Sequence, residues 1–92
     1  MSYVKTKYSE DIMARIIDNE RKNLIGTNLK RLRKKLKMSQ RELSLRLELL
    51  GVYVCRGSVS RIEDYSRTVT DIELYAIAEV LGVSTDELLG KR

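Results

Sequence analysis

Small, basic and hydrogen-bonding side chains gather between residues 56 and 63, in the segment RGSVSRIE. Val59 and Ile62 are spaced three apart, which places both on one side of a helix. The other side is formed by Arg56, Gly57, Ser58, Ser60 and Arg61. These side chains can bind a partner through hydrogen bonds and charge, but they do not pair a nucleophile with a base. The segment therefore favours binding over catalysis.

A second helix is expected directly before this segment. Ser39, with Glu42 three residues later, is typical of a capping box at a helix start. Three leucines follow on one face, and a glycine that can end the helix in the left-handed conformation comes after them: Leu43, Leu47, Leu50 and Gly51. Two short helices across a tight link, the second with a basic outer face, are typical of a helix-turn-helix.

Apolar residues also occur on the outer side of the first helix and in the link. Leu45 and Leu49 point away from the inward leucines at 100° per residue, so the N-terminal helix or a partner is expected to cover them. Val52 and Val54 are expected to enter the core, while Tyr53 lies outward.

The rest of the chain predicts further helices and no strand. Ser9 is expected to cap an N-terminal helix that runs to Lys22, with an apolar stripe of Ile12, Ile16 and Ile17. The next helix, Leu24 to Lys37, has inward positions at Ile25, Leu29, Leu32 and Leu36. Two more capping boxes, Thr70 with Glu73 and Ser84 with Glu87, start the last two helices, with Gly82 between them.

The helix that starts at Thr70 has two apolar stripes. Its inward residues are Leu74, Ile77, Ala78 and Leu81, and its second stripe is Ile72, Ala76 and Val80. One helix of a small bundle does not easily bury both faces. We therefore expect the second stripe to form a homodimer contact.

Composition limits the classes of function. The 92 residues fit one domain, contain no histidine, and include one cysteine, Cys55, which cannot form an internal disulfide and is expected to be a small core filler. No apolar run reaches membrane-spanning length, and a cytoplasmic location fits the cysteine usage. No catalytic constellation, metal site or cofactor site is expected.

Charge is segregated along the chain. Residues 21–67 contain thirteen Lys or Arg and four Asp or Glu, whereas residues 68–90 contain five acidic residues and no basic one. The net charge is +5. A basic half beside an acidic half indicates one face for a polyanion and another turned away from it.

The order of these segments resembles the Cro/repressor-type helix-turn-helix family, also called the xenobiotic-response-element family. The matching pieces lie between Ile25 and Leu89 and include Ile25-Gly26, Met38-Ser39-Gln40, Glu42-Leu43, Ser58-Val59-Ser60-Arg61-Ile62-Glu63 and Leu81-Gly82-Val83-Ser84. The resemblance implies an all-α, lambda-repressor-like five-helix domain over residues 24–92, with an N-terminal arm and helix over residues 1–23. It also implies binding of double-stranded operator DNA, usually as a homodimer.

The resemblance assigns roles to single residues. The base-facing positions are Arg56, Gly57, Ser60 and Arg61, with Arg61 the best candidate to read a guanine. The phosphate-contacting positions are Ser39 and Gln40, and Arg41 and Arg67 are added as further candidates. Arg33 and Glu63 match a structural pair that ties the first helix of the domain to the recognition helix.

Two departures from the family pattern concern loops. The link between the central helices is longer by about five residues, and Asp64-Tyr65 stands where family members often have glycine. We predict a sequence-specific DNA-binding regulator, a repressor on a palindromic operator. The alternative is a protein-interaction module or antitoxin-type protein that binds its partner through Leu45, Leu49 or the N-terminal helix, with DNA binding secondary.

Overall fold

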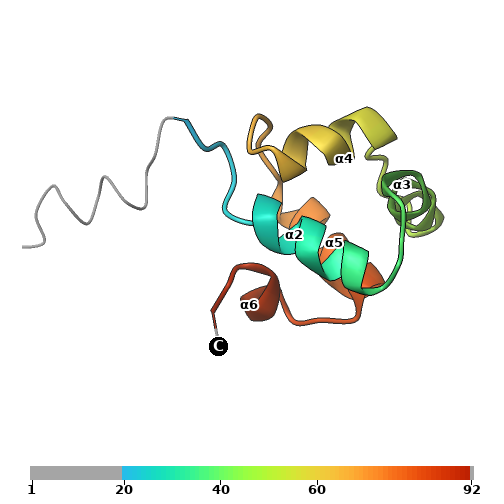
Figure 1. The fold of residues 1–92 in the computed structure, drawn as a ribbon. Helices are drawn as coiled ribbons and strands as arrows, with labels where there is room; N and C mark the ends of the chain where they lie inside the picture. Colours follow the sequence, from blue (N-terminus) through green and yellow to red (C-terminus); the bar gives the residue numbers. More distant parts are fainter. Residues whose placement is uncertain (1–19, 92) are drawn as a thin grey trace, which may run out of the picture.

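The computed structural model describes residues 20–91, and the regular elements of this part of the chain are all helices, without a strand. Its helices are α2 (Gly26–Lys35), α3 (Gln40–Leu49), α4 (Arg56–Glu63), α5 (Asp71–Leu81) and α6 (Thr85–Leu88) (Figure 1). None of the described helices is long and apolar enough to cross a membrane. The predicted helix from Ser9 lies outside the described residues, apart from its expected end. The last turn predicted at Arg21 and Lys22 was wrong, because residues 20–22 are not helical.

Three helices begin where the sequence predicts a cap. The hydroxyls of Ser39, Thr70 and Ser84 each accept a hydrogen bond from the backbone N–H three residues later, at 2.9, 3.1 and 3.0 Å. At Thr70 the bond is reciprocal, because Glu73 accepts from the Thr70 N–H at 3.0 Å. At Ser39 the carboxylate of Glu42 instead pairs with Arg46, and at Ser84 the carboxylate of Glu87 makes no return bond, so the capping boxes predicted at these two positions are only half formed.

The core contains most of the residues predicted to face inward. The fully buried large side chains are Ile25, Leu29, Leu43, Leu47, Val54, Val59, Ile62, Ile77 and Leu88. The predictions for Leu36 and Leu50 were wrong, since these side chains are 50% and 54% exposed. Both residues are the C-caps of their helices, where the backbone leaves the helical path and the 3.6-residue period no longer applies.

The two stripes predicted for α5 are divided differently in the structure. Ala76, assigned to the second stripe, is buried, and Val80 is half-buried against the core. Ile72 and Tyr75 are the exposed apolar residues of this helix. The body of the protein thus covers a wider part of α5 than the predicted inward stripe.

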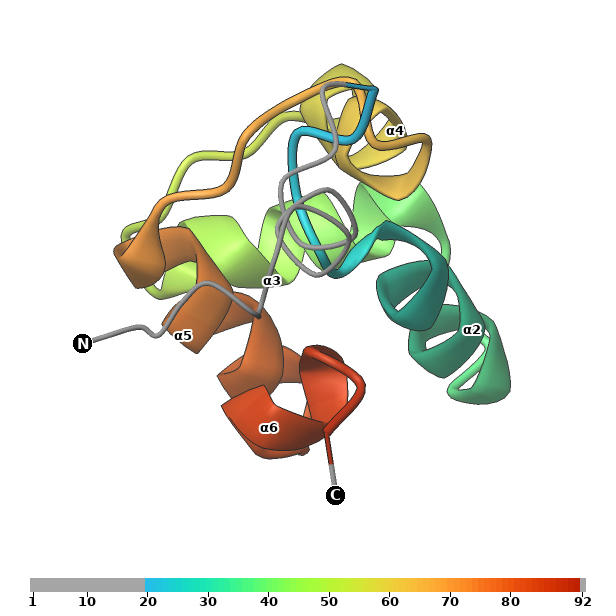
Figure 2. The same ribbon diagram turned by 90° about the vertical axis from the view of Figure 1, so that its left-hand side faces the viewer.

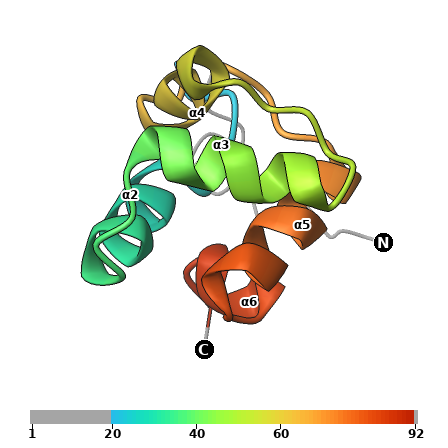
Figure 3. The same ribbon diagram turned by 90° about the vertical axis from the view of Figure 1, so that its right-hand side faces the viewer.

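In Figure 3, α3 lies across the front of the molecule, with α4 above it, α2 near one end and α5 and α6 below. The connection between α3 and α4 is six residues long, from Leu50 to Cys55. It is longer than the tight link typical of a helix-turn-helix, in the direction that the comparison with the family pattern predicts. Val54 is buried, Val52 is half-buried and Tyr53 is exposed, as predicted. The connection runs beside the loop between α4 and α5 (Figure 2).

Candidate nucleic-acid interface

Helix α4 has one side fixed in the body of the protein and one side in solvent. Val59, Ile62 and Glu63 are buried. The exposed residues are Arg56, Gly57, Ser60 and Arg61, the four positions predicted to face DNA bases. The sequence therefore places the basic and small residues of this helix on one accessible face.

The arginines on this face are free of strong partners in the described part of the chain. Nη2 of Arg61 donates to the hydroxyl of Ser58 at 3.2 Å, within the same helix. Arg56 makes no hydrogen bond or ion pair with any described residue. Neither guanidinium is neutralised by a carboxylate of residues 20–91, so both retain donors for a ligand.

The packing of the domain does not require a glycine at residue 57. A Cβ built at this position would meet Nη1 of Arg61 at 3.6 Å and Sγ of Cys55 at 4.0 Å, which are ordinary contacts. Glycine inside a helix lowers its stability relative to alanine. The absence of a side chain at residue 57 is therefore a feature of the outer surface, where it lets another molecule approach the backbone.

A buried ion pair joins α4 to α2. Nε and Nη2 of Arg33 donate to the two carboxylate oxygens of Glu63 at 2.6 and 3.0 Å, and the two side chains are 8% and 4% exposed. Nη1 of Arg33 donates to the carbonyl of Met38 at 2.7 Å. Nε2 of Gln40, in the first turn of α3, donates to Glu63 at 3.0 Å. One carboxylate thus bonds to the two neighbouring helices.

The start of α2 touches the end of α4 through the backbone. A Cβ on Gly26 would lie 2.7 Å from the carbonyl oxygen of Ile62 and 2.9 Å from that of Glu63, so a larger residue would push the helices apart. Asn23 adds a buried link that the sequence analysis missed. Its Nδ2 donates to the carbonyls of Ile62 (3.0 Å) and Arg67 (2.9 Å), while Oδ1 accepts from the N–H groups of residues 25 and 26.

The turn after α4 forms without glycine. Tyr65 has a φ of 69°, in the left-handed region that is uncommon for other residues. Its hydroxyl donates to Oγ1 of Thr27 at 2.7 Å and accepts from the Thr27 N–H at 3.1 Å. The Tyr65 carbonyl accepts from the N–H of Lys22 at 2.9 Å, and the Arg21 guanidinium lies 4.8 Å from the ring centre. These contacts hold the turn and attach residues 21 and 22 to the end of α4.

The predicted phosphate contacts lie in different environments. Ser39 caps α3, and Arg41 in its first turn is exposed and has no partner among the described residues. The amide of Gln40 is already bonded to Glu63. Arg67 forms a two-pronged pair with Glu73, at 3.0 and 2.9 Å, and also donates to the carbonyl of Thr68. Its guanidinium is therefore committed to the start of α5.

Two further observations concern reactivity and charge. Cys55 is exposed at the N-cap of α4, so the prediction of a core filler was wrong. The Ser58 hydroxyl, 3.4 Å away, lowers the pKa of its thiol.

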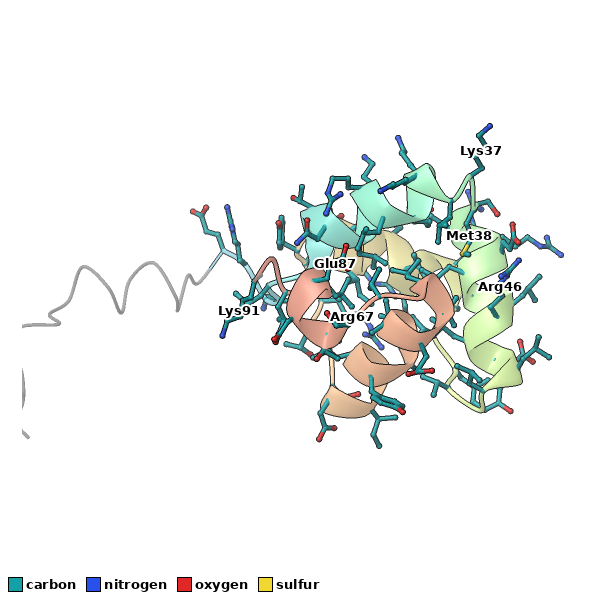
Figure 4. All side chains as sticks on the ribbon, turned by 90° about the horizontal axis from the view of Figure 1, so that it is seen from below. Lys37, Met38, Arg46, Arg67, Glu87 and Lys91 are labelled. Carbon is teal, nitrogen blue, oxygen red and sulfur yellow. The ribbon has the colours of Figure 1, made fainter. Side chains whose placement is uncertain are left out.

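The last turn of α2 holds Arg33, Lys34 and Lys35, and the Lys37 side chain beyond it extends from the surface in Figure 4. No cluster of metal-binding side chains occurs among the described residues.

Comparison with known proteins assigns this arrangement to a family. A family model described as helix-turn-helix matches residues 29–88, which is 60 of the 92 residues. No match was found among curated proteins or solved structures. The matched range contains α3, α4, α5 and α6, and the all-helical fold agrees with the lambda-repressor-like five-helix architecture. The chain belongs to the helix-turn-helix family of DNA-binding regulators, which is not a family of enzymes.

Proposed function

We propose that this protein is a transcriptional repressor that binds a palindromic operator as a homodimer and reads the major groove with the outer face of α4. The observation that carries the proposal is the exposure of two arginines, Arg56 and Arg61, that pair with no carboxylate of the described residues, on a helix whose opposite side is fixed by buried contacts. A rigid helix with free guanidinium groups can hold bidentate hydrogen bonds to guanine.

Arg61 is proposed as the main base-reading residue, with Arg56 and Ser60 beside it. A bidentate contact to O6 and N7 of guanine discriminates against the wrong base by about 1–3 kcal/mol. Gly57 contributes by letting the α4 backbone approach the groove. Dimer half-sites are expected about 34 Å apart, one turn of the double helix.

Phosphate contacts are proposed at the start of α3. The helix N-terminus at Ser39 favours an anion, and the exposed Arg41 adds a positive charge beside it. Gln40 would hold a phosphate mainly through its backbone N–H, since its side chain is bonded to Glu63. Arg67, which is paired with Glu73, is proposed to position the start of α5 and not to bind phosphate.

The test is selection of bound duplexes from a randomised DNA library at near-physiological salt. Wild-type protein should enrich a palindrome that it prefers by roughly a thousandfold or more over bulk DNA. Arg61→Ala should relax the preference at one position of each half-site. Arg41→Ala is the matched control, because loss of a phosphate contact should weaken binding to all sequences and lower the salt slope by about 0.9.

A second candidate function is supported by the exposure of Leu45 and Leu49 on α3. A protein-interaction module of the antitoxin type would use such leucines to bind another protein. The same selection separates the two functions, since a module of this kind should enrich no sequence and should lose DNA steadily as salt increases.

A further inference from the structure

The turn after α4, residues 64–67, contains one cation, and that cation is already paired. Arg67 is bonded to the carboxylate of Glu73. Asp64 carries a negative charge, and its carboxylate accepts hydrogen bonds from the N–H and the hydroxyl of Ser66, at 3.0 and 2.6 Å. The carboxyl end of a helix also carries a negative partial charge. This end of α4 therefore disfavours an anion unless another segment supplies positive charge.

The segment that leads into α2 brings positive charge to this turn. The backbone N–H of Lys22 donates to the Tyr65 carbonyl at 2.9 Å, and the Arg21 guanidinium lies 4.8 Å from the centre of the Tyr65 ring. Asn23, the next residue, is bonded to two backbone carbonyls of the same region. Figure 2 shows this segment, in blue, beside the turn at the end of α4. Three consecutive residues are thus fixed to one end of the recognition helix.

This attachment explains why a tyrosine occupies residue 65. Its φ of 69° lies in the left-handed region, which glycine adopts without strain and other residues disfavour. Glycine would form the turn more easily, but it would have no ring for Arg21 and no hydroxyl for Thr27. Tyr65 therefore holds residues 21 and 22 at the end of α4 despite the strain in the turn.

We propose that Lys22 contacts a DNA phosphate beside the carboxyl end of α4, and that Tyr65 is the residue that positions it there. This contact rests on the proposed function, in which α4 occupies the major groove. The Lys22 side chain is exposed, and its ammonium forms no ion pair or hydrogen bond with any described residue. Lys22 also lies outside residues 29–88, the range that the family model matches.

The dimensions of the groove support this contact. A helix with its side chains is about 10–12 Å across, and the major groove of B-DNA is about 12 Å wide. A helix that fills the groove has the segments at its ends beside the phosphate backbones. Arg41 is proposed to meet a phosphate at the start of α3, and Lys22 meets another at the end of α4. Two such contacts fix the register of the reading helix on the duplex.

The experiment measures the affinity of the full chain for the selected operator and for a duplex of random sequence, at several salt concentrations, by fluorescence anisotropy. Lys22→Ala should lower the affinity at low salt by about tenfold. It should also reduce the log–log salt slope by about 0.9, the value for one phosphate contact, without changing the base preference. Lys91→Ala is the matched control and should keep the wild-type slope, since Lys91 is also exposed but follows α6, on the opposite side of the molecule from α4 in Figure 1.

A second variant tests the positioning role of Tyr65. Tyr65→Gly removes the ring and the hydroxyl but suits the left-handed turn. It should lose the same share of the salt slope, about 0.9, and Lys22→Ala added to it should lower the slope no further. A Tyr65→Gly protein that has the helical circular dichroism spectrum and the salt slope of the wild type overturns the positioning role.

The outcomes separate this contact from the proposed function. If the wild type selects an operator, and Lys22→Ala loses no more slope than Lys91→Ala, the phosphate contact is refuted and the proposed function stands. If the wild type selects no sequence while Lys22→Ala alone lowers the slope, the proposed function is refuted and the contact with DNA phosphate is supported.

Discussion

Replacement of Glu63 tests whether the buried ion pair orients the recognition helix. The Glu63 carboxylate accepts three hydrogen bonds, two from Arg33 and one from Gln40. In Glu63→Ala the Arg33 guanidinium, which is almost fully buried, keeps only its bond to the Met38 carbonyl. Breaking a buried pair in this way costs about 3–5 kcal/mol. Small domains have about 5–15 kcal/mol in total, so urea unfolding should show a protein that has lost much of its stability.

Loss of stability alone would not show that the pair positions α4, so a second variant separates the two effects. Arg33→Met combined with Glu63→Leu replaces the pair by apolar side chains of similar volume. Such a replacement is often neutral or stabilising by about 1–4 kcal/mol. The double variant should therefore regain stability. If the pair orients α4, its DNA affinity should remain lower by about tenfold, or 1.4 kcal/mol.

The refuting result is a double variant that is as stable as wild type and binds the selected operator with unchanged affinity and base preference. The pair would then contribute to packing and not to the orientation of α4. Affinity is measured by fluorescence anisotropy with the same duplex for all variants. Only preparations with the helical circular dichroism spectrum of the wild type are compared.

Three further substitutions test the glycines and the pH dependence. Gly57→Ala should raise the stability by up to about 1 kcal/mol while lowering DNA affinity; tighter binding would contradict the close approach of the α4 backbone to DNA. Gly26→Ala should destabilise the domain by about 1–3 kcal/mol in thermal unfolding, because its Cβ would clash with the Ile62 and Glu63 carbonyls; an unchanged melting temperature would refute this. Hydrogen bonds from Arg67 lower the pKa of Glu73, so its contribution to stability is present above the ordinary Glu pKa of about 4.3 and is lost as pH falls through the lowered value. Glu73→Gln should abolish that part of the acid destabilisation, and an identical pH profile would show that the pair is not the cause.

Local signals in the sequence were sufficient to predict most helix starts and the core. Ser39, Thr70 and Ser84 cap helices through bonds that span only three residues, and the inward leucines of α3 follow the helical period until its last turn. Leu36 and Leu50 were mispredicted because a periodic pattern does not show where the helix stops. Cys55 was mispredicted because its apolar neighbours in the link do not reveal that it caps α4.

Contacts between segments distant in sequence could not be predicted from composition or period. Asn23 bonds to residues 39 and 44 positions away, and Tyr65 reaches Thr27 across 38 positions. The Arg33–Glu63 pair was expected only because of the family resemblance. The engagement of Arg67 by Glu73 and of Gln40 by Glu63 depends on side-chain geometry, and it changes the role that each residue can play toward DNA.

The separation of α4 into a fixed side and a free side has a consequence for how this protein could acquire new operators. In the described part of the chain, the side chains of Val59, Ile62 and Glu63 and the backbone at the end of the helix hold it in place. Among the described residues, the outward side chains at 56, 57, 60 and 61 make one hydrogen bond, from Arg61 to Ser58 within the same helix. If α4 reads DNA as proposed, recognition and folding are encoded by different residues of one eight-residue segment. Substitutions at the four outward positions would then reprogram the preferred DNA sequence, in the laboratory or in evolution, without repacking the domain that carries them.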